Sequence, residues 1–167
     1  MQTLNYDDVT VGAQLGAIDK GVITTTHIMR WSAAIENFHR IHYDHPFATE
    51  HDKLPGVLIN GSWKQHVLIQ MVKDGLSPAG WLWKLRFRYK KMDIAGDSVL
   101  GTAKVVRKQR AGDFGFVTLE LQLVNQHGEV STVGAGIGVL PVTGGPPVPY
   151  PFIALPAYAD IQLPPDA

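Results

Sequence analysis

Residues 81–90 alternate strictly between two kinds of side chain. The odd-numbered positions are all apolar and mostly aromatic, whereas the even-numbered positions are basic after Leu82. A period of two predicts a β-strand with one face turned toward a core. Short glycine-containing turns separate the strands that follow, so neighbouring strands are expected to run antiparallel. These further strands are predicted at about 98–108, 114–124 and 130–140, with an earlier one at about 16–24.

A long apolar helix is predicted before this run of strands. Ser62 can cap its start, Gln65 completes a capping box, and Pro78 prevents the helix from continuing. More than half of the helix surface between these signals is apolar, and such a helix must be buried. The apolar face comprises Trp63, Val67, Leu68, Met71, Val72 and Leu76. The sequence therefore predicts an α+β fold: a single domain in which an antiparallel sheet wraps around a central helix.

Two further segments complete the predicted organisation. An amphipathic helix is expected over about 26–37, because apolar residues recur there at helical spacing. From Pro141 onward the chain is rich in proline, which fixes φ and removes a backbone donor, so this part is neither helix nor central strand. We therefore divide the chain into a domain at 1–140 and a Pro-rich tail at 141–167. The aromatic side chains of the tail need cover, either from its own domain or from a partner subunit.

Composition excludes several classes of function. Fifteen basic side chains balance fifteen acidic ones, so no global field favours nucleic acid. There is no cysteine, which rules out disulfides and thiol chemistry. No apolar run is long enough to cross a bilayer, the first residues do not resemble a secretory signal, and a cytoplasmic location is expected. His39, His42 and His45 are spaced by three, but Pro46 interrupts a helical arrangement, so no metal site is expected.

Two polar clusters carry the candidate chemistry. Residues 37–44 place two histidines, an arginine, an amide and a carboxylate between the shorter helix and a loop. The imidazole of His42 titrates close to neutral pH, which suits proton transfer. Residues 60–62 open the central helix, where the Gly61 N–H is free and the helix dipole favours negative charge. Together the clusters indicate acid/base chemistry beside a polarised carbonyl.

The string at 37–44, followed by Phe47-Ala48 and by a Pro-Gly-x-x-x-x-Gly stretch at 55–61, resembles the MaoC-like hydratases and dehydratases of acyl thioesters. The resemblance is closest to the mesaconyl-CoA hydratase and 3-hydroxyacyl-thioester dehydratase branch, and it covers about residues 5–140. It implies a hotdog fold and reversible, syn-type addition of water across the 2,3 double bond of a thioester. No bound cofactor is implied beyond coenzyme A as part of an acyl-CoA substrate, which we favour over acyl carrier protein. Asn37 stands where many members have an aspartate, and Asn60 where the usual residue is histidine.

The resemblance also implies roles for individual residues. His42 is the expected proton carrier, Asn37 holds the water, and the Gly61 N–H binds the thioester oxygen. His39 acts directly or supports these groups. Asn60 is expected beside the thioester oxygen, and the basic stripe with Arg86 and Arg88 is expected to contact the phosphates of coenzyme A.

Simpler readings of the same residues stay open. His42 can be a hydrogen-bonded loop histidine, Asn37 a helix C-cap, and Gly61 a means of tight entry into the helix. Arg40 is expected to pair with Asp44 or Glu36. The basic stripe can be a solvated sheet face.

Partners and a second class of function follow from the fold. An open sheet leaves an unpaired edge, so we expect a homodimer or a higher homo-oligomer, with a hetero-partner as an alternative. The alternative function is a non-catalytic or half-site subunit that binds acyl-CoA or completes a partner's active site. A thioesterase is disfavoured, because the central helix offers only Asp74 as a carboxylate, at its end.

Overall fold

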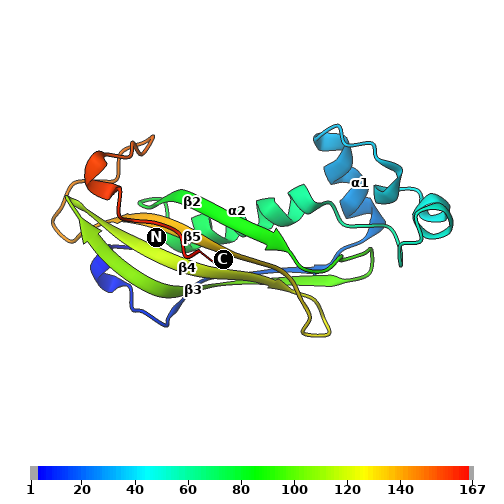
Figure 1. Ribbon diagram of the computed structural model, residues 1–167, viewed down its shortest axis with the longest axis horizontal. Coiled ribbons are helices and arrows are strands. Elements are labelled where there is room, and N and C mark those ends of the chain that lie inside the picture. The colour runs from blue at the N-terminus through cyan, green and yellow to red at the C-terminus, as the bar shows by residue number, and fades with distance from the viewer. Residues whose placement is uncertain (1–3, 166–167) are drawn as a thin grey trace.

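A computed structural model describes residues 4–165 and shows one curved antiparallel sheet around a helix (Figure 1). Residues 1–3 and 166–167, the outer ends of the predicted domain and tail, lie outside the described residues. The spatial order of the strands is β1-β3-β4-β5-β2, so β1 and β2 form the two edges. The strands are β1 (Gln14–Val22), β2 (Trp81–Tyr89), β3 (Ser98–Ala111), β4 (Phe114–Val124) and β5 (Val130–Pro141). The predicted α+β hotdog architecture is confirmed.

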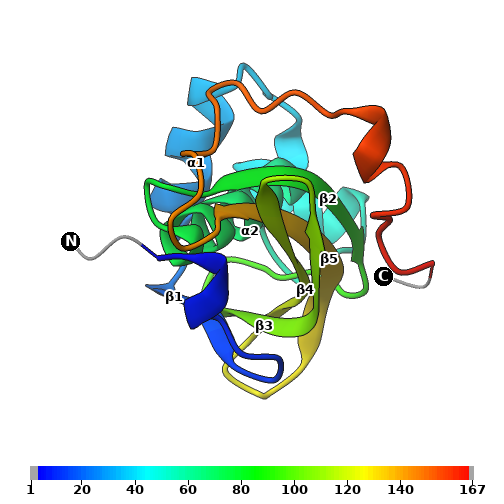
Figure 2. The same cartoon turned by 90° about the vertical axis from the view of Figure 1, so that its left-hand side faces the viewer.

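The central helix α2 (Gly61–Leu76) lies in the hollow of the sheet, as the end-on view makes clear (Figure 2). Its apolar side chains at positions 67, 68, 71, 72 and 76 are completely buried. Each such side chain stabilises the fold by about 1.5–3 kcal/mol relative to exposure. Two glycines let α2 approach β1 closely, since a Cβ on Gly75 would lie 2.5 Å from the Leu15 carbonyl oxygen and one on Gly16 2.7 Å from that of Met71.

The alternation of β2 is interrupted by a β-bulge, which the sequence did not predict. Leu82 pairs with Gly138 and Lys84 with Ile137, so Trp83 is an extra residue. An extra residue reverses the facing of everything beyond it. As a result Leu85 and Phe87 pack against the α2 core, whereas Trp81 and Trp83 pack on the outer face of the sheet. The prediction of one continuous aromatic face was wrong.

Residues 25–60 form a lobe beyond the end of the sheet, where α2 begins (Figure 1). Its elements are α1 (Thr25–Ala34), the short helix η2 (Arg40–His42) and the π-helix η3 (Phe47–His51). The helix α1 ends three residues before the predicted Asn37, because Glu36 adopts a left-handed conformation with φ 54°. The Asn37 N–H then donates to the Ser32 carbonyl oxygen at 2.9 Å, and this bond satisfies a free carbonyl at the C-terminal end of α1. Asn37 is therefore not the left-handed cap itself.

The tail packs on the outer face of its own sheet. Phe152, Tyr158 and Ile161 are buried against Phe116 and the two tryptophans of β2. Lys84 ties the tail down by donating to the Ile161 carbonyl oxygen at 2.8 Å. Two one-turn helices, η1 (Tyr6–Asp8) and η4 (Pro156–Tyr158), lie near the two ends of the chain.

Candidate active site

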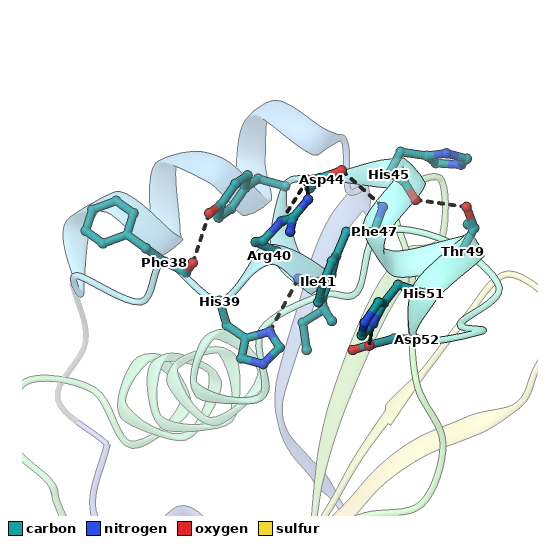
Figure 3. A network of polar contacts seen from close by, with 11 residues as sticks. Phe38, His39, Arg40, Ile41, Asp44, His45, Phe47, Thr49, His51 and Asp52 are labelled. Carbon is teal, nitrogen blue, oxygen red and sulfur yellow. Dashed lines mark hydrogen bonds and ion pairs between the residues drawn. The ribbon is translucent and has the colours of Figure 1, made fainter.

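The lobe is built around a compact network at residues 38–52 (Figure 3). Arg40 donates to Asp44 at 3.0 and 2.7 Å, and the second oxygen of Asp44 accepts the Phe47 N–H at 3.1 Å. The predicted Arg40–Asp44 pair is thus confirmed. The hydrogen bond from Arg40 lowers the pKa of the Asp44 carboxyl in the folded protein. The pair therefore stabilises the fold above the pKa that Asp44 has in the unfolded chain, and this stabilisation is lost as the pH falls through the folded pKa. The network gives η3 a fixed start and holds residues 39–42 in place.

His42 is anchored to the chain that leads into α2. Its Nδ1 lies 2.8 Å from the carbonyl oxygen of Leu58, three residues before the helix, and the ring is only 7% exposed. A carbonyl oxygen only accepts, so Nδ1 carries a proton, and in the neutral ring Nε2 has the lone pair. The Leu58 N–H donates in return to the Ile41 carbonyl oxygen at 2.9 Å. The geometry leaves Nε2 of His42 as a base without a partner among the described residues.

Asn37 and His39 lie on the turn that enters this segment. The Asn37 side-chain oxygen accepts the His39 N–H at 3.3 Å, which leaves its amide NH₂ free of described partners. Nδ1 of His39 accepts the Ile41 N–H at 3.4 Å, and the His39 and His42 rings lie 6.4 Å apart. Both residues are therefore next to His42 in the same loop. Their predicted roles in holding water and supporting the base stay predictions.

Gly61 is the first residue of α2, and neither its N–H nor that of Ser62 donates to another described group. The phenol of Tyr89 lies against it: a Cβ on Gly61 would stand 2.9 Å from the Tyr89 hydroxyl oxygen. Glycine is thus needed here to make room for that ring. Burial raises the pKa of the Tyr89 phenol, which keeps the hydroxyl protonated as a donor. Tyr89 was missed from the sequence because its contact with Gly61 joins residues 28 positions apart, which no local pattern indicates.

Ser62 does not cap α2 as predicted. The cap position belongs to Asn60, which makes no side-chain capping bond. The Ser62 hydroxyl instead accepts the indole N–H of Trp31 at 3.0 Å and so links α1 to α2. This tertiary contact removes the predicted capping box with Gln65.

Asn60 does not point toward open space, as a substrate contact would require. Its side chain is 1% exposed, and its NH₂ donates to the Ser32 hydroxyl at 3.1 Å while the hydroxyl returns a bond of 3.3 Å. Ser32 is itself completely buried on α1. The pair fixes the entry of α2 against α1, which assigns Asn60 to positioning rather than to direct contact.

Replacing Ser32 with alanine is expected to lower the free energy of unfolding by about 1–3 kcal/mol, because the buried Asn60 amide loses its partner. The matched change is Ser62→Ala, which also removes a hydroxyl between α1 and α2 but at an exposed position. It is expected to cost less than about 1 kcal/mol. Urea denaturation measures both, and equal losses would show that burial of the Asn60 amide is not the cause.

A buried ion pair supports the same helix end and was also missed. The Lys64 ammonium donates to Asp93 at 2.9 Å and to the Lys91 carbonyl oxygen at 3.1 Å, and both charged side chains are almost fully buried. The Asp93 carbonyl oxygen accepts the Ile59 N–H at 2.9 Å. Lys64 falls at helical spacing on the apolar face of α2, and this charge within an apolar stripe was the available signal.

Arg86 and Arg88 are not beside this site. They alternate with Leu85 and Phe87, whose side chains face α2, so both arginines stand exposed on the outer face of the sheet. Arg88 lines a groove there together with Lys90, Glu120 and Pro164. Within one subunit Arg86 and Arg88 therefore face away from α2, and their predicted phosphate contact stays a prediction.

Within residues 4–165, no group of three or more histidine, aspartate or glutamate side chains is placed to hold a metal ion. His39 and His45 point away from each other (Figure 3). None of the helices in the described part of the chain is long and apolar enough to cross a membrane.

Comparison with solved structures identifies the class of this fold. The (R)-hydratase PhaJ1 from Pseudomonas aeruginosa superposes with a TM-score of 0.74 at 15% identity, over 84% of this chain and 87% of that one. The (R)-hydratase from A. caviae gives 0.71 at 17% identity, over 80% and 98%. The ChsH1–ChsH2 complex from Mycobacterium tuberculosis gives 0.67 at 18% identity, over 80% and 98%. These similarities establish a hotdog fold.

The amino-acid sequence identifies the family. Residues 13–97, about half of the chain, match the family of hydroxyacyl-thioester dehydratases type 2. This protein belongs to that family. No curated protein sequence matches it.

Proposed function

We propose that this protein adds water to, or removes water from, the 2,3 double bond of an acyl thioester. The observation that carries the proposal is the His42 ring, whose Nδ1–H is fixed on Leu58 so that Nε2 is a free base at the entry of α2. The unpaired N–H groups of Gly61 and Ser62 lie at that same helix end. Family membership supports the reaction type.

The steps follow from these groups. Nε2 of His42 takes a proton from water as the oxygen attacks C3 of the enoyl thioester. Negative charge moves to the thioester oxygen, where the N–H groups at the start of α2 stabilise it. The imidazolium then returns its proton to C2 on the same face, and the product is a 3-hydroxyacyl thioester. We assign the amide NH₂ of Asn37, in the same loop, to orienting the water, since the side-chain oxygen expected for this role already accepts the His39 N–H.

The test uses pure protein with crotonyl-CoA and with longer, branched and dicarboxylic enoyl-CoAs. Loss of the absorbance of the conjugated thioester measures hydration. Turnover of at least one member is expected. Tight binding without turnover of any member would contradict the proposal and would favour the alternative, a subunit that completes a partner's site.

We also propose that a second copy of the chain covers the β2 edge. A groove of about 1060 Å³ runs between α2 and this edge strand, lined by apolar side chains that include Ile69, Leu82 and Leu85. An open edge beside an apolar groove is a site for strand pairing. The Mycobacterium tuberculosis neighbour is a complex of two different chains, so a hetero-partner is the alternative.

Introducing a charge into this groove is expected to dissociate the dimer. Ile69→Asp places a carboxylate on the half-buried face of α2 that borders the edge, whereas Ile153→Asp makes the same change on the exposed tail. Light scattering after size-exclusion chromatography should report a dimer for the wild type and for Ile153→Asp, and a monomer for Ile69→Asp. A dimer that survives Ile69→Asp would place the interface elsewhere.

A further inference from the structure

A second groove, of about 400 Å³, lies between α1, the end of β1 and the first turns of α2. It is distinct from the loop that holds His42. Three basic side chains line it, Lys20, His27 and Arg30, together with the indoles of Trp31 and Trp63. No acidic side chain takes part in the lining. The groove therefore combines positive charge with flat aromatic surface.

The basic groups keep donors available. Arg30 forms no ion pair or hydrogen bond with any described residue. Nδ1 of His27 accepts the Thr24 N–H at 3.1 Å, so its proton sits on the unpaired Nε2. The Lys20 ammonium donates one hydrogen bond to the side-chain oxygen of Gln70 at 2.8 Å, which leaves two of its N–H groups as donors. All three side chains can bind an anion without first breaking an ion pair.

The indoles are held rather than mobile. The Trp31 N–H is bonded to Ser62, and its ring lies 5.1 Å from that of His66. Trp63 is half-buried on α2, where it packs against the core. Fixed aromatic faces are suited to stacking a heteroaromatic base at little cost in conformational entropy.

We propose that this groove binds the 3′-phosphoadenosine diphosphate part of coenzyme A. Arg30 and Lys20 bind phosphate oxygens through charge-assisted hydrogen bonds, and an indole face receives the adenine. This inference rests on the proposed function, and it selects the carrier: the substrate is an acyl-CoA. The prosthetic group of acyl carrier protein has no adenosine and would leave the groove empty.

The spacing along the helices agrees with such a ligand. Trp63 and the Ser62-bound Trp31 lie at the start of α2, beside the free N–H of Gly61. Gln70, the partner of Lys20, lies nine residues beyond Gly61 along α2, which corresponds to about 13 Å of helix. An extended pantetheine arm spans a comparable length. A thioester at the start of α2 thus has its phosphates within reach of Lys20, and the nucleotide bends back along the groove so that its adenine meets an indole.

The experiment compares two thioesters with the same reacting group. Crotonyl-CoA carries the nucleotide, and crotonyl-N-acetylcysteamine lacks it. Arg30→Ala is expected to lower kcat/KM for crotonyl-CoA by about tenfold to a hundredfold, as loss of a hydrogen bond to a charged group predicts, and to leave the truncated substrate unaffected. Arg30→Lys should recover part of the loss. Arg88→Ala removes an exposed arginine from the outer face of the sheet and should affect neither substrate.

Equal losses on both thioesters, or no loss on either, would overturn the inference. A loss on crotonyl-CoA that is confined to Arg88→Ala would also overturn it and would place the phosphates on the outer face.

A binding experiment tests this inference independently of the proposed function. Adenosine 3′,5′-bisphosphate is titrated into the wild type and Arg30→Ala by calorimetry. Binding that weakens at least tenfold in Arg30→Ala supports the groove even if no thioester is turned over. Turnover of crotonyl-CoA by a protein that does not bind the bisphosphate would contradict the groove and leave the proposed function standing.

Discussion

Replacing His42 with alanine is expected to lower kcat for crotonyl-CoA hydration by about 10²–10⁴-fold, because the change removes the group that transfers the proton. Alanine also removes the bond to the Leu58 carbonyl oxygen. His42→Asn separates the two effects, since its NH₂ can donate to Leu58 while it has no basic nitrogen. Activity should be lost in both variants, and initial rates measured at saturating substrate provide the comparison.

The control for this prediction is His45→Ala. His45 is exposed and points away from His39 (Figure 3), so its removal should leave kcat unchanged. Recovery of activity in His42→Asn would mean that position 42 serves only to anchor the loop. The two variants should retain the cooperative urea transition of the wild type, which shows that lost activity is not lost fold.

Replacing Lys64 with methionine is expected to lower the free energy of unfolding by about 3–5 kcal/mol. The change leaves Asp93 buried at 1% exposure without its cation, and uncompensated buried charge is strongly destabilising. Lys91→Met breaks a pair with Glu129 in which both side chains are about half exposed, and it should cost far less than Lys64→Met. Urea denaturation gives both values.

A second variant tests the cause of that loss. Lys64→Met combined with Asp93→Leu removes both charges and should recover most of the stability, because matched apolar groups often replace a buried ion pair without cost. If Lys64→Met alone costs no more than Lys91→Met, the ion pair does not hold the entry of α2. If the double variant is less stable than Lys64→Met, the Asp93 side chain has a further role.

Local patterns were sufficient to predict the architecture. The period of two marked β2, the turns between strands marked β3 to β5, and the broad apolar face marked α2, because all these signals are local in the sequence. Boundaries shifted by a few residues where backbone conformation decided them, as at the left-handed Glu36. The bulge at Trp83 left no mark in the alternation, since it arises from pairing with β5.

The candidate site was predictable only in part. The position of His42 near the start of α2 followed from the motif, whereas the partners of each side chain did not. Asn60 is bonded to Ser32, Ser62 to Trp31 and Gly61 packs under Tyr89, and in each case the two residues lie 28 or more positions apart. Such contacts depend on how α1, α2 and β2 meet, which no local period reveals.

The most direct measurement of the central claim is hydration in heavy water. Wild-type protein is incubated with crotonyl-CoA in D₂O, and the product is analysed by mass spectrometry and proton NMR. Addition of water with His42 as the proton carrier predicts 3-hydroxybutyryl-CoA with a single deuterium at C2. Release of free coenzyme A with crotonate, or recovery of crotonyl-CoA unchanged, would contradict the account.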